Sequence, residues 1–119
     1  MFVRVRVLFT TAVLFSTQAL SQPSFDCNYA NNPDEIAICN NSTLSYLDNI
    51  ANKGYLYLRN SYGKQAANSI DYPIIKQRQS CGSNVQCIYG VQVQSIRLFQ
   101  SYGAPISVPN INLNNNANT

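Results

Sequence analysis

The pattern of apolar and polar residues predicts helices in the central part of the chain. Apolar positions recur at spacings of three and four in two long stretches, as on one face of an amphipathic helix. The first stretch contains Leu44, Leu47, Ala51, either Gly54 or Tyr55, and Leu58. The second contains Val85, Ile88, Val91, Leu98 and Tyr102, with the small Ser95 at the remaining position. We therefore expect one helix that is capped by Ser42 and ends at Gly63, and another that ends at Gly103.

Two shorter helices are predicted from the residues at their boundaries. The run Asn32 to Glu35 is typical of a helix start, because it supplies a capping side chain, a proline at the first turn and two acids at the positive helix end. This helix should end near Cys39. A further helix should begin at residue 72 or 73 and end at Cys81, since Pro73 is tolerated in a first turn and Gly82 can terminate a helix.

The apolar faces of the two long predicted helices supply the expected core. Its members are Leu44, Leu47, Ala51, Leu58, Ile88, Val91, Leu98 and Phe99. Gly54 lies within the first of these helices, where glycine costs about 1 kcal/mol relative to alanine. The glycine therefore indicates either a close helix contact or a bend at this position.

The first 21 residues have the order of a secretory signal peptide. Arg4 and Arg6 precede an apolar run over residues 7–15, and small residues stand at positions −3 and −1 of a cleavage point after Ser21. The apolar run is about half the roughly 20 residues that cross a bilayer as a helix. We expect a mature protein that is periplasmic or secreted and that has no permanent membrane anchor.

The rest of the chain is long enough for one domain and too short for two. We expect a helical domain over residues 22–103 and a disordered tail over residues 104–119. The tail is rich in proline and asparagine and lacks apolar periodicity. The predicted fold is therefore a small all-α domain of three to four helices, held by disulfides and followed by this tail.

The even number of cysteines in an exported chain predicts two disulfides. The cysteines are Cys27, Cys39, Cys81 and Cys87, and three pairings agree with the count. We favour Cys27 with Cys39 and Cys81 with Cys87, because each pair brackets one short segment, although crossed pairings remain open. Zinc is the rival explanation, but the chain has neither a Cys-x-x-Cys pair nor a histidine, so we expect no metal site.

Composition argues against a nucleic-acid partner and against catalysis. The chain has eight basic residues, of which two lie in the predicted leader, so six remain against five acids and give a net charge of +1. These basic residues are scattered rather than clustered.

The absence of histidine removes the commonest general base. Asp34 and Glu35 project about 100° apart on a helix and are interpreted as solvated helix-start charges, not as a catalytic pair. We expect neither an enzyme nor a cofactor.

The residues around the cysteines form a motif that covers most of the predicted domain. In its first half these are Ser24 to Cys27, Ala30, Glu35, Ile38, Cys39, Leu44, Leu47, Asp48 and Tyr55, and in its second half Arg78, Cys81, Cys87 and Ile88. Over about residues 24–99 the chain resembles the LprI-type lysozyme inhibitor family. The resemblance implies an exported bacterial protein that blocks lysozyme and so protects the cell wall.

The segment from Cys81 to Cys87 is the candidate site for such a partner. Lysozyme works with two carboxylates in a cleft, so an inhibitor needs a protruding segment that offers hydrogen-bond donors. A disulfide would shape this polar segment in advance and reduce the ordering cost of binding. The candidate contact residues are Lys76, Arg78, Ser83, Asn84 and Gln86. In the alternative hypothesis the segment only joins two helices of a periplasmic accessory or structural domain.

Overall fold

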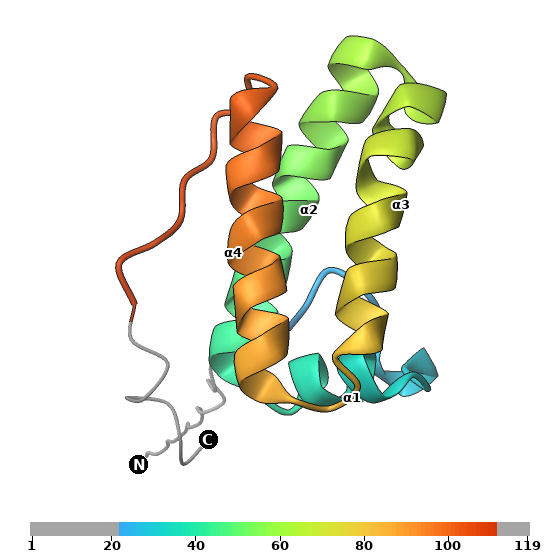
Figure 1. The fold of residues 1–119 in the computed structure, drawn as a ribbon, viewed down its shortest axis with the longest axis vertical. Coiled ribbons are helices and arrows are strands. Elements are labelled where there is room, and N and C mark those ends of the chain that lie inside the picture. Colours follow the sequence, from blue (N-terminus) through green and yellow to red (C-terminus); the bar gives the residue numbers. More distant parts are fainter. Residues whose placement is uncertain (1–21, 112–119) are drawn as a thin grey trace, which may run out of the picture.

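The computed structural model describes residues 22–111, and this part of the chain is all-helical, without a strand. The elements in chain order are the 3₁₀ helix η2 (Cys27–Tyr29), α1 (Pro33–Cys39), α2 (Ser42–Tyr62), α3 (Lys64–Ser80) and α4 (Val85–Ser101). The three long helices run side by side, and the short α1 lies across one end of them (Figure 1). The predicted all-α fold is confirmed. The predicted signal peptide and residues 112–119 of the predicted tail lie outside the described residues.

The boundaries of the long helices follow from capping side chains and one glycine. Asn41, rather than the predicted Ser42, caps α2 by accepting a hydrogen bond from the backbone N–H of Leu44. Asn84 caps α4 in the same way through the N–H of Cys87. Gly63 separates α2 from α3 with a φ of 97°, which a residue with a Cβ adopts only with strain. The chain therefore passes from one helix to the next through a single residue.

Helix α3 begins at Lys64, earlier than the predicted start at residue 72 or 73, and contains Pro73 in its interior. The proline removes the hydrogen bond to the carbonyl of Ser69. Because Ser69 is exposed, water can donate to that carbonyl instead. The first part of α3, before residue 72, was not predicted. It is held by packing, since Ala67 is buried in an apolar cluster and Ile70 packs against that cluster.

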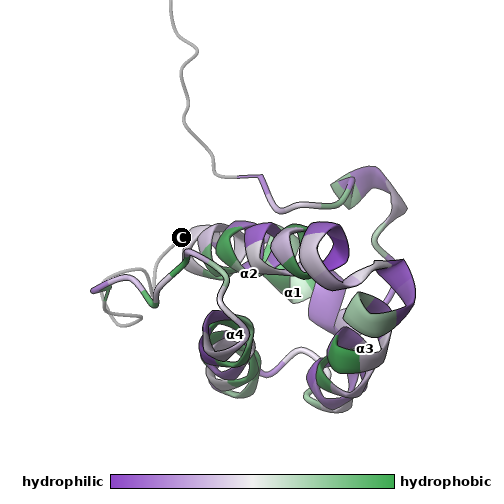
Figure 2. Cartoon of the chain, turned by 90° about the horizontal axis from the view of Figure 1, so that it is seen from above, coloured by the Kyte–Doolittle hydropathy of each residue, from purple (hydrophilic) through white to green (hydrophobic). Residues whose placement is uncertain are grey.

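The apolar core consists of two clusters. Figure 2 shows the hydropathy of the helices from above. The larger cluster contains Leu58, Ala67, Ile74, Val91, Phe99 and Ala104, and the smaller one contains Ile38, Leu44 and Ile88. Six of the eight predicted core residues are buried, and the other two, Ala51 and Leu98, pack against the larger cluster from partly exposed positions. The amphipathic pattern thus placed the buried faces of α2 and α4 correctly.

Gly54 is a point of close contact in the larger cluster. A Cβ at this position would lie 2.8 Å from the Cβ of Phe99 and 2.7 Å from the Cδ1 of Ile106. The missing side chain therefore lets α4 and the segment after it approach α2. Ile106 and the buried Ala104 belong to the segment predicted as a disordered tail, so the first residues of that segment pack against the core.

The two disulfides join the predicted pairs. Cys27 is bonded to Cys39 and Cys81 to Cys87, with Cα–Cα distances of 5.9 and 5.6 Å, which lie in the usual range. Both bonds indicate that the protein folds in an oxidising environment. None of the helices in residues 22–111 is long and apolar enough to cross a membrane.

Candidate functional site

Arg78, predicted to approach a partner, lies in the interior of the helical bundle. Its Nε donates to Asp34 Oδ2 at 2.6 Å, and its Nη1 lies 3.7 Å from Asp48 Oδ1. The side chain of Arg78 is 12% exposed and that of Asp34 is 0% exposed. Arg78 on α3 therefore links α1 to α2, and its guanidinium is engaged within the fold rather than presented with the loop.

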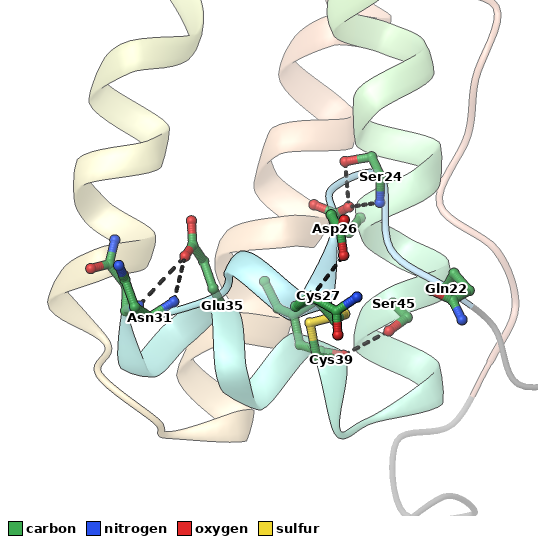
Figure 3. Close-up of a disulfide and its surroundings, with 12 residues drawn as sticks. Gln22, Ser24, Asp26, Cys27, Asn31, Glu35, Cys39 and Ser45 are labelled. Atoms are coloured by element: carbon green, nitrogen blue, oxygen red, sulfur yellow. Dashed lines mark hydrogen bonds between the residues drawn. A yellow bond between two sulfur atoms is a disulfide. The ribbon is translucent and has the colours of Figure 1, made fainter.

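Asp34 is not the solvated helix-start charge that the sequence suggested. It is fully buried in the first turn of α1, where the helix dipole favours a negative charge and Arg78 offsets part of its desolvation. Its Oδ1 has no hydrogen-bond partner among the described residues. The neighbouring Glu35 acts at the helix start as expected, because it accepts from the backbone N–H groups of Asn31 and Asn32 (Figure 3).

Asp48 extends this set of contacts to the segment before η2. Its Oδ2 accepts from the backbone N–H of Ser24 at 2.7 Å and from the Ser24 hydroxyl at 2.6 Å. The adjacent Asn49 donates to the backbone carbonyls of Gln22 and Ser45. One connected set of polar contacts therefore ties the start of the described chain to α1, α2 and α3.

Asp34, Arg78, Asp48 and Gln92 are here called the polar layer. Asp48, Arg78 and Gln92 line one pocket together with Ile74, Val91 and Phe99 of the larger apolar cluster. Gln92 is 3% exposed, and neither its Oε1 nor its Nε2 has a partner in the described residues. The sequence pattern did not single out this residue.

Asp71 on α3 is a further acid near the layer. Burial is the largest influence on its carboxyl and raises its pKa, while the charge of Arg78 lowers the pKa and that of Asp48 raises it. A raised pKa means that ionised Asp71 is less favourable in the folded state than in the unfolded state. Ionised Asp71 therefore destabilises the fold at neutral pH.

Replacing Asp71 by asparagine should stabilise the protein at neutral pH. The cost of the ionised carboxylate is fully present above its folded-state pKa and is lost as the pH falls below the unfolded value near 3.8. The melting temperature of the variant should therefore exceed that of the wild type at about pH 7 and approach it at about pH 3. Thermal unfolding at both pH values measures this, and equal melting temperatures at the higher pH would contradict the expectation.

The loop closed by Cys81 and Cys87 lies at the end of the bundle where α1 packs (Figure 1). Ser83, Asn84 and Gln86 are exposed on this loop and the first turn of α4. Lys76 is exposed on α3, with its Nζ 5.8 Å from the centre of the Tyr72 ring. The structure thus groups three of the five predicted contact residues, places the ammonium of Lys76 over Tyr72 on the preceding helix, and directs Arg78 into the bundle.

Comparison with known proteins does not assign this chain to a family. No protein-family model, curated protein or solved structure matches the chain. The resemblance to the LprI-type family therefore stays a prediction. The fold itself defines a small disulfide-linked helical protein with a polar layer inside its core. The acids and cysteines of residues 22–111 form no group that could hold a metal ion.

Proposed function

We propose that this protein is an exported lysozyme inhibitor that acts by binding and that contacts the enzyme through the loop from Cys81 to Cys87. The supporting observation is the construction of this loop. It is closed by a disulfide and fixed to α4 by the Asn84 cap, while Ser83 and Gln86 are exposed. A segment that already has one conformation loses less entropy on binding. It can therefore offer donors to the carboxylates of a lysozyme cleft.

The surroundings of the loop assign different roles to the five candidate residues. Arg78 acts from the interior, because its ion pair with Asp34 holds α3 against α1 and so positions Cys81, where the loop begins. Lys76 is exposed on α3 with its ammonium over the Tyr72 ring, and it would leave that ring to reach a partner at the loop. The Asn84 oxygen is engaged by the helix cap, so this side chain offers only its amide nitrogen to a partner. The direct contacts then come from Lys76, Ser83 and Gln86.

A triple variant tests this contact surface. Changing Lys76, Ser83 and Gln86 to alanine should weaken inhibition by about tenfold or more, which corresponds to ~1.4 kcal/mol of binding free energy. The inhibition constant is measured by following the turbidity of bacterial cell walls that are digested by lysozymes of the c, g and i types. Arg78 and Asn84 are left unchanged, because their replacement would disturb the fold or the start of α4.

A matched control carries the same three residue types, all exposed, at the opposite end of the bundle. Its changes to alanine are at Lys64, Ser61 and Gln100. This control should inhibit like the wild type, and so should a chain that ends at Ile111, since the proposal gives residues 112–119 no role. Equal losses in the two triple variants would refute the loop as the contact surface. Absence of inhibition by the wild type would refute the function and favour an accessory domain.

A further inference from the structure

A pocket of about 330 Å³ lies between α2, α3 and α4, and the polar layer forms part of its wall. The segment before η2 contributes Ser24 and Phe25 to one side of the pocket. Its volume is at the lower end of the range found for small-molecule sites. The pocket is separate from the loop of the proposed lysozyme contact, because none of its lining residues lies between Cys81 and Cys87.

Gln92 is the side chain in this pocket whose hydrogen-bonding groups are both unpaired. The residue is 3% exposed and lines the pocket, while its Oε1 and Nε2 are buried without a partner in the described residues. Buried amide groups in native proteins are nearly always paired, because an unpaired one is destabilising. A ligand with one donor and one acceptor would satisfy both atoms of the carboxamide.

The charges around the pocket are unbalanced. Three acids line it, namely Glu35, Asp48 and Asp71, against the single cation Arg78. Arg78 is already engaged by a fourth acid, Asp34. The excess charge is therefore negative, and its effect is stronger in a partly enclosed site than in bulk water. Burial raises the pKa of Asp71, and the positive charge of Arg78 does not fully compensate this effect.

We propose that this pocket binds a small organic cation, namely a primary amine with an apolar body and a polar group that pairs with the carboxamide of Gln92. The amine lies toward Asp48 and Asp71, and the apolar body packs among side chains such as Ile74 and Phe99. Because both carboxamide atoms are covered in the unliganded protein, the Gln92 side chain turns toward the ligand, so that Oε1 accepts from its polar group and Nε2 donates to it. This inference does not depend on lysozyme inhibition, since it uses no loop residue.

Tyramine is a suitable probe, because it carries a primary amine, an aromatic body and a hydroxyl that both donates and accepts. Two compounds with the same ring test the charge: 4-ethylphenol is neutral, and 3-(4-hydroxyphenyl)propionate is an anion. Calorimetric titration should show that tyramine binds about tenfold or more tightly than either. Tyramine should also raise the melting temperature, since it binds the folded state. No binding of tyramine, or equal binding of all three compounds, would overturn the proposal.

Variants of two glutamines on α4 locate the site. Replacing Gln92 by leucine should lower the tyramine affinity by about tenfold or more. The same change should raise the melting temperature of the unliganded protein, because it removes two unpaired buried atoms at similar side-chain volume. A loss of binding then cannot come from a loss of folding. Gln94 is exposed, so Gln94→Leu is the matched control and should bind like the wild type. Unchanged tyramine binding by Gln92→Leu would show that the proposed site is wrong.

Discussion

Replacing Arg78 by methionine should lower the free energy of unfolding by about 3–5 kcal/mol. The variant leaves the fully buried Asp34 and the nearly buried Asp48 without their cation. Methionine retains a long and adaptable side chain, so the loss reflects the uncompensated charge more than a cavity. Urea unfolding followed by circular dichroism, with the disulfides kept oxidised, measures the difference.

Two further variants separate this ion pair from general effects of the substitution. Arg97 is exposed on α4, and Arg97→Met should change the stability by less than about 0.5 kcal/mol. Adding Asp34→Asn to Arg78→Met should recover part of the loss, because the buried negative charge is then removed as well. If Arg78→Met alone costs less than about 1 kcal/mol, Asp34 is solvated and the polar layer is not buried as described.

Replacing Phe99 by alanine should cost about 3–5 kcal/mol. Phe99 is 1% exposed and belongs to the larger apolar cluster, where it packs over the bare backbone of Gly54. Gly54 has no side chain that could move into the space left by the ring, so a cavity remains between α2 and α4. Thermal and urea unfolding of the variant give the change in stability.

The neighbouring Leu98 is the control for this prediction. It is only partly buried, so Leu98→Ala should cost clearly less than Phe99→Ala. The two positions point about 100° apart on the helix, and their relative effects therefore report which face of α4 is buried. Equal losses at Leu98 and Phe99 would show that α4 is rotated from its described orientation.

The sequence predicted α2 and α4 well because each has a mostly apolar row at spacings of three and four and is followed by a glycine. Helix α3 was predicted in part because Pro73 was interpreted as a first-turn residue. Ala67, Ile70 and Ile74 already have helical spacing, and Arg78 follows Ile74 by four residues. Since residues four apart share a helix face, a helix that starts at Lys64 would have placed Arg78 toward the core.

The partners of the buried polar residues could not be predicted in the same way. Periodicity shows which face of a helix is buried, but not which polar groups meet when the helices pack. Asp34 and Arg78 are 44 positions apart in the chain, and only the crossing of α1 over the end of the bundle brings them together. The disulfides were predictable because each spans a short segment, of 12 and 6 positions, and needs no knowledge of helix packing.

Both disulfides lie at the end of the bundle where α1 packs, since Cys81 contacts the cluster that contains Ile38. Within the described residues, the opposite end of the helical bundle has no disulfide. It is held by contacts such as the hydrogen bond from the Tyr62 hydroxyl to the Tyr102 carbonyl. Partial unfolding should therefore begin with fraying at the unlinked end. A molecule that is opened there by heat or by a protease would keep the cross-linked end, and with it the shape of the loop from Cys81 to Cys87.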